Sequence, residues 1–117
     1  MEKSNKDLNI VEHILSYCYE IEKTISRFGE DYTVFQADSV YQNACALCIL
    51  QIGELAGHIS GEFKSGHPEV PWKNIRGMRN VVAHAYGSLS IQTTWETIIA
   101  DIPELKVQCL EILNKMS

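Results

Sequence analysis

One run of the sequence, residues 79–86, collects side chains that suit chemistry at a phosphate group. Arg79 offers a fixed cation with a fork of donors, and His84 offers a ring that exchanges protons near neutral pH. Metal-independent cleavage of RNA needs these two groups at the phosphate, where negative charge builds in the transition state. The residue types therefore predict a ribonuclease-type site with Arg79 and His84 as catalytic residues and Asn80 beside them.

The apolar spacing around this run predicts a helix that holds the polar side chains away from the core. At about 100° per residue, the apolar side chains share one arc and the polar ones share the opposite side. The core arc contains Ile75, Met78, Val81, Val82 and Ala85. The polar side contains Arg76, Arg79, Asn80, His84 and Tyr86. An ordinary solvated face would be rich in Lys, Glu and Gln; this one is rich in donors for phosphate, so Arg76 is expected to support phosphate binding.

Arg79 and His84 lie about 140° apart around an ideal helix, so a single helix does not bring both to one phosphate. A two-fold dimer would solve this, because the copies from both subunits would then surround one pocket. Such a pocket would also concentrate positive charge locally.

The predicted second helix, residues 39–59, favours a dimer, because its apolar residues point almost all round it. Surplus apolar surface on a helix usually meets a partner. Gly53, Ala56 and Gly57 are small enough to let a second subunit approach closely, or to thin the interior of the bundle. We therefore expect a homodimer across the second helix and the motif helix.

Most of the remaining sequence is also predicted to be helical. Apolar residues at three- and four-residue steps predict a first helix over residues 7–28, which Gly29 ends. A connection follows until Asp38 and Ser39, which are good caps for the second helix. Residues 60–72, rich in Gly, Ser and Pro, are expected to form a loop or short turn.

The C-terminal part predicts the motif helix and one further segment. The motif helix is expected to start near Pro71 and to stop at Gly87. Pro103 must kink or split the last helical segment, residues 91–113, and Asp101 would then cap a separate terminal helix. The fold class predicted is all-α: an up-and-down bundle of four to five helices, with residues 1–117 as a single domain.

Composition limits the class of protein. The chain has 117 residues, of which 45% are hydrophobic and 21% charged, as in globular chains that bury one core. No apolar run reaches the roughly 18 to 20 residues of a membrane span, and the polar start lacks a signal-peptide core. We therefore expect a cytoplasmic protein without a membrane partner. Because the net charge is −5, contact with nucleic acid must be local.

The cysteines allow one alternative site. Cys18, Cys45, Cys48 and Cys109 lie in apolar stretches and are expected to be buried thiols. A metal could instead use the Cys45-x-x-Cys48 pair with His58, His67 or His13, but one such pair without a second is a weak signal. We expect no metal and no cofactor.

The sequence leaves two roles open for the side chain of Glu54. It shares a helix face with His58 and could form a surface pair with it. It could instead point toward the active-site cleft and orient Arg79 or Arg76.

The run from Arg79 to Tyr86 resembles the R-x4-H-x-Y motif of HepT-like proteins, which are bacterial and archaeal toxins with a HEPN domain. The similarity covers nearly the whole chain. It includes Ile52-Gly53-Glu54, Pro71-Trp72, Ile75-Arg76-Gly77-Met78, Trp95 and Asp101-Ile102-Pro103-Glu104-Leu105.

This resemblance implies a dimeric HEPN-like bundle that acts as a metal-independent endoribonuclease toxin, with Arg79 and His84 in the active site and Asn80 beside them. It also implies a partner, an MntA-type nucleotidyltransferase antitoxin that transfers AMP to the motif tyrosine, here Tyr86. A phosphoryl adduct near Arg79 would place negative charge where the RNA phosphate should sit. The alternative is a non-catalytic subunit of a nucleotidyltransferase complex that only binds nucleotide or partner.

Overall fold

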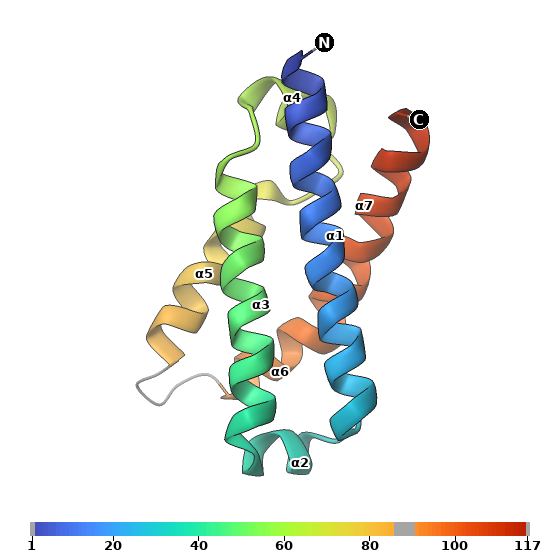
Figure 1. Ribbon diagram of the computed structural model, residues 1–117. Helices are drawn as coiled ribbons and strands as arrows, with labels where there is room; N and C mark the ends of the chain where they lie inside the picture. Colours follow the sequence, from blue (N-terminus) through green and yellow to red (C-terminus); the bar gives the residue numbers. More distant parts are fainter. Residues whose placement is uncertain (1, 86–90, 117) are drawn as a thin grey trace.

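The computed structural model describes residues 2–85 and 91–116, and it describes the side chains of residues 5–80 and 91–115. Within these residues all of the regular secondary structure is helical (Figure 1). The main elements are α1 (Glu2–Phe28), α3 (Ser39–Gly57), α5 (Trp72–Ala85) and the C-terminal segment that ends in α7 (Ile102–Met116). The chain runs down α1, up α3, down α5 and up α7, so the predicted all-helical, up-and-down arrangement is confirmed.

The helices pack in an order that leaves α5 on the outside. α3 contacts both α1 and α5, and α1 contacts α7 on its other side. The buried apolar residues of the described part form one cluster, which includes Ile14, Ile52, Ile75 and Ile112. At the lower end, Tyr41 stacks on Phe28 and meets the edge of Phe35. Because the core lies between four helix faces, α5 needs only one apolar stripe and can present its other side to solvent.

Local signals set the ends of α1 and α3. The backbone at Gly29 has φ of +108°, which only glycine adopts without strain, and α1 stops there as expected. Asp38 caps α3, because its carboxylate accepts hydrogen bonds from the backbone N–H groups of Val40 and Tyr41. α3 ends at Gly57, slightly before the predicted end of the second helix.

Two short helices lie where the sequence predicted irregular chain. α2 (Tyr32–Ala37) lies in the first connection and is capped by Asp31. α4 (Gly61–Gly66) occupies part of the stretch that was predicted as a loop, and Ser60 caps it. The buried carboxylate of Asp7 holds Ser60 through its backbone N–H at 2.9 Å and its hydroxyl at 2.7 Å. A contact between α1 and the cap of α4 therefore holds the chain that leads to α5.

The C-terminal segment is bent without being broken. α6 (Ile91–Glu96) runs into a π-helical turn, η1 (Thr97–Asp101), and then directly into α7. The proline ring at position 103 crowds the carbonyl four residues earlier, and the wider π turn relieves this. The expectation that Asp101 caps a separate helix is wrong, because Asp101 is the last residue of η1 and no non-helical cap residue precedes α7.

The cysteines lie in the core as predicted. Cys18, Cys45, Cys48 and Cys109 are all buried and free. Burial raises the pKa of the Cys45 thiol to about 12, and burial raises that of Cys48 to about 11. Within the described residues no three metal-ligating side chains come together, so the alternative of a Cys45–Cys48 metal site gains no support. In the described residues no helix has the length and apolarity to cross a membrane.

Candidate active site

The start of α5 is anchored by an aromatic side chain. Trp72 is buried, and its ring N–H donates a 3.0 Å hydrogen bond to the carbonyl of His67. Ile75 and Met78 follow on the buried face, as the predicted core arc requires. Val81, Val82 and Ala85 lie outside the residues whose side chains the structure describes. The first half of α5 is therefore fixed by its apolar face, which leaves Arg76, Arg79 and Asn80 exposed.

Two glycines of α3 let α5 approach closely. A Cβ at Gly53 would lie 2.9 Å from the Cβ of Arg79 and 3.2 Å from its backbone nitrogen. A Cβ at Gly57 would lie 2.6 Å from Nη1 of Arg76. Of the two roles considered for these small residues, the one within the bundle is confirmed for Gly53 and Gly57, because both face α5 of the same chain. They bring both arginines against α3.

Glu54 positions Arg79. Its Oε1 lies 2.8 Å from Nε of Arg79, and the two side chains are 47% and 50% exposed. Of the two roles considered for Glu54, the one that orients Arg79 is confirmed. Because the contact uses Nε, the terminal nitrogens of the guanidinium can still donate to a phosphate.

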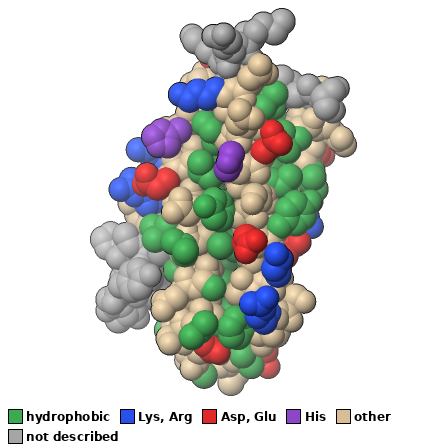
Figure 2. Space-filling model, in the orientation of Figure 1, with side chains coloured by type: hydrophobic (Ala, Val, Ile, Leu, Met, Phe, Trp, Pro, Cys, Tyr) green, Lys and Arg blue, Asp and Glu red, His purple; other side chains and the backbone are tan. Residues whose placement is uncertain are grey.

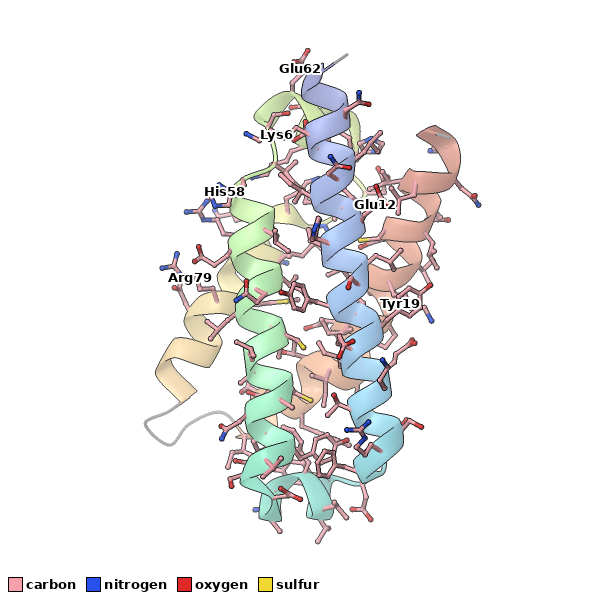
Figure 3. All side chains as sticks on the ribbon, in the orientation of Figure 1. Lys6, Glu12, Tyr19, His58, Glu62 and Arg79 are labelled. Carbon is pink, nitrogen blue, oxygen red and sulfur yellow. The ribbon has the colours of Figure 1, made fainter. Side chains whose placement is uncertain are left out.

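Arg76 lies one turn earlier in α5, beside the end of α3. Its guanidinium sits over Gly57, the last residue of that helix. A cation is favourable there, because the helix C-terminus carries a partial negative charge. His58 and Arg79 project from the same edge of the molecule (Figure 3). In the space-filling view, basic, acidic and histidine side chains gather along this edge at the upper left (Figure 2).

The structure describes only part of the predicted motif. The backbone of His84 lies in α5, but its side chain is outside the described side chains. Tyr86 lies outside the described residues altogether. The roles of His84 and Tyr86 therefore remain predictions. What the geometry establishes is an exposed cationic edge, Arg76 and Arg79, held against α3 by glycine contacts and by Glu54.

Comparison with known proteins identifies the family. The model of the ribonuclease HepT-like family matches residues 8–112. The chain belongs to this family. A protein of Caldanaerobacter subterraneus subsp. tengcongensis, named as a predicted RNase, is 37% identical over 105 residues, which cover 90% of this chain and 92% of that protein.

A second relative is similar over most of its length. A protein of Thermococcus cleftensis, named as a probable ribonuclease HepT, is 32% identical over 107 residues, which cover 91% of this chain and 93% of that protein. No solved structure shows a significant match to the chain. These comparisons confirm the resemblance to HepT-like proteins that the motif of residues 79–86 indicated.

Proposed function

We propose that this HepT-like chain is a metal-independent endoribonuclease toxin. The observation that carries the proposal is the family match over residues 8–112, taken with the exposed Arg79 that Glu54 holds at the motif helix. The substrate is RNA, whose 2′-hydroxyl supplies the nucleophile without a metal. The whole chain acts as one domain.

The proposed chemistry divides between His84 and Arg79. His84 takes the proton of the 2′-hydroxyl, the 2′-oxygen attacks phosphorus, and the bond from phosphorus to the 5′-oxygen breaks. The products are a 2′,3′-cyclic phosphate and a 5′-hydroxyl, whose oxygen takes up a proton from water as it leaves. Arg79 stabilises the negative charge that develops on the phosphate oxygens. Asn80 orients the reacting groups, and Arg76 binds a phosphate of the same strand.

A homodimer would complete the site. α3 presents an exposed stripe in which Val40 is 64% and Leu47 is 57% exposed. Glu54 follows Leu47 at seven residues, so it lies on the same face of α3. A two-fold contact across this stripe would bury the apolar side chains and bring two copies of Arg79 toward one another. His84 of one subunit could then act with Arg79 of the other.

The proposal includes regulation by a partner. An MntA-type nucleotidyltransferase would act as the antitoxin of a type VII system and would transfer AMP from ATP to Tyr86. The helical wheel drawn from the sequence predicts position 86 about 20° from Arg79, and on that prediction the added phosphate would compete for the same guanidinium. Intact mass after incubation with the partner and ATP tests this step.

The deciding experiment removes the proposed proton-transfer group. We expect His84→Ala to abolish RNA cleavage and toxicity while the protein stays folded and binds its partner. The matched control is His13→Ala, because His13 is exposed on α1 and its ring pairs with the carbonyl of Asn9. Equal cleavage by both variants would contradict the proposal.

The alternative is a non-catalytic subunit that binds nucleotide or partner through the same cationic edge. It predicts that the native protein cleaves no RNA. It also predicts that Arg79→Ala lowers partner or nucleotide affinity without any catalytic effect.

A further inference from the structure

A second feature of α5 is a cavity on the side that faces the C-terminal segment. Its volume is about 540 Å³, and it lies between α5, α6, η1 and the start of α7. The buried side chains of Ile75 and Leu105 form an apolar floor. Lys73, Asp101 and Glu104 are among the polar lining residues. The cavity therefore combines an apolar base with charged groups of both signs.

The register of α5 connects this cavity to the proposed active site. Lys73 and Gly77 line the cavity. Asn80 and position 84 follow them at helical steps of three and four residues, so all four positions lie along one face of α5. The rise from position 77 to position 84 is about 10 Å. A short run of single-stranded RNA with one phosphate near position 84 can therefore reach the cavity.

The two carboxylates in the cavity are suited to accept hydrogen bonds. Asp101 and Glu104 are both exposed, and neither makes a hydrogen bond or an ion pair with another of the described residues. Partial burial raises the pKa of Asp101, and the charges of Glu104 and Glu96 raise it further. An N–H donor that enters the cavity would offset both effects.

The other ligands that carboxylates attract fit less well. No three metal-ligating side chains gather anywhere in the described residues. Mg²⁺ demands near-octahedral oxygen coordination, which an apolar floor does not provide. A phosphate would meet two like charges. A planar base with adjacent N–H donors suits both parts of the cavity, because its faces can rest on apolar side chains while its edge reaches a carboxylate.

Guanine is the base with that edge: N1–H and the 2-amino group lie side by side, and one carboxylate can accept from both. We propose that the cavity bounded by α5 and η1 is a guanine-binding subsite next to the scissile phosphate, with Asp101 and Glu104 as the base-reading residues. This inference rests on the proposed ribonuclease function. Lys73, exposed at the cavity, would pair with the phosphate of the bound nucleotide. The π turn places Thr97 and Asp101 at the same cavity, as such turns often do at functional sites.

The first test uses oligoribonucleotides in which one position near the cut is guanine, adenine or inosine. We expect guanine at one fixed position to raise kcat/KM on the order of tenfold over adenine. Inosine, which keeps N1–H but lacks the 2-amino group, should fall between them. The double variant Asp101→Asn, Glu104→Gln should bring the guanine-to-adenine ratio close to unity.

The matched control is Glu111→Gln, which changes an exposed carboxylate of α7 that does not line the cavity. It should keep the native ratio. Cleavage without base preference, or a preference that the double variant retains, would overturn the subsite.

A second measurement separates the subsite from the ribonuclease proposal. Titration of guanosine 3′-monophosphate, followed by amide shifts, should show tighter binding than adenosine 3′-monophosphate, and the double variant should lose the difference. If the native protein binds guanosine selectively but cuts no RNA, the proposed function fails and the subsite stands. If it cuts RNA but binds both nucleotides equally and cuts without preference, the subsite fails alone.

Discussion

Glu54 and Arg79 meet at 2.8 Å although each side chain is about half exposed. An ion pair of this kind contributes little to the free energy of unfolding, because water screens it and two side chains must be ordered. The ion pair matters because it holds the Arg79 side chain in one orientation. It fixes the guanidinium by Nε and leaves the terminal nitrogens for an incoming phosphate. At this scale the pair is a positioning device for the proposed chemistry.

Glu54→Gln tests this positioning role. We expect the melting temperature to change little, whereas kcat for RNA cleavage should fall on the order of tenfold, because Arg79 is no longer held. KM should change less than kcat. The control is Glu20→Gln, which removes an exposed ion pair with Lys23 at 3.6 Å on α1. A similar loss of kcat in both variants would contradict a specific role for Glu54.

At the scale of elements, the contact between α3 and α5 decides where the arginines lie. Gly53 has no room for a side chain, because the backbone nitrogen of Arg79 would lie 3.2 Å from its Cβ. Gly77, within α5, has nothing within 4 Å of its Cβ position. A side chain at position 53 would therefore clash with α5, whereas a side chain at position 77 would meet no neighbour.

These requirements predict opposite effects of the same substitution. Gly53→Ala should lower the free energy of unfolding by about 1 to 3 kcal/mol, because α5 must shift away from α3. Gly77→Ala should raise it by about 0.5 to 1 kcal/mol, because alanine favours a helix interior. Urea unfolding measures both. A stabilising Gly53→Ala would show that the helices do not approach as described.

The sequence was enough to predict elements whose signals are local. Gly29 and Asp38 set helix ends through their own backbone and side chain, so their roles could be inferred from residue type. α4 was missed because a six-residue helix is too short to show a period. The same limit applied to α2.

The contacts between elements were harder to predict. That Gly53 faces Arg79 depends on how α3 and α5 pack, which the pattern along either helix does not specify. The Glu54 contact could be anticipated as one of two possibilities, since both Arg and His lay within reach of a carboxylate. The cavity beside η1 could not be, because it depends on a π turn that no simple periodicity predicts.

At the scale of the whole molecule, α3 and α7 both carry well-exposed apolar side chains. Val40 and Leu47 lie on the face of α3 that continues to Glu54, whereas Val107, 53% exposed, lies on α7. α7 packs against α1, and α5 packs against α3, so Val107 lies on a different side of the bundle from Val40 and Leu47. Of these two sites, the one on α3 adjoins the edge that carries Arg76 and Arg79.

This difference makes the proposed dimer testable. Leu47→Glu should convert a dimer to a monomer, as measured by light scattering at several protein concentrations, and should lower cleavage. Val107→Glu, which places the same charge at a similarly exposed position, should leave both unchanged. A monomeric native protein that still cleaves RNA would refute the two-subunit site.

The hydrogen bonds from Ser60 to Asp7 also have a consequence for the order in which the protein is made. They join residues 53 positions apart, so these two bonds cannot form until Ser60, and with it α1 and α3, has left the ribosome. α5 is synthesised only afterwards, and it packs on the face of α3 that carries Gly53, Gly57 and Glu54. A nascent chain that stops before α5 therefore already contains this face of α3 but none of the proposed catalytic residues.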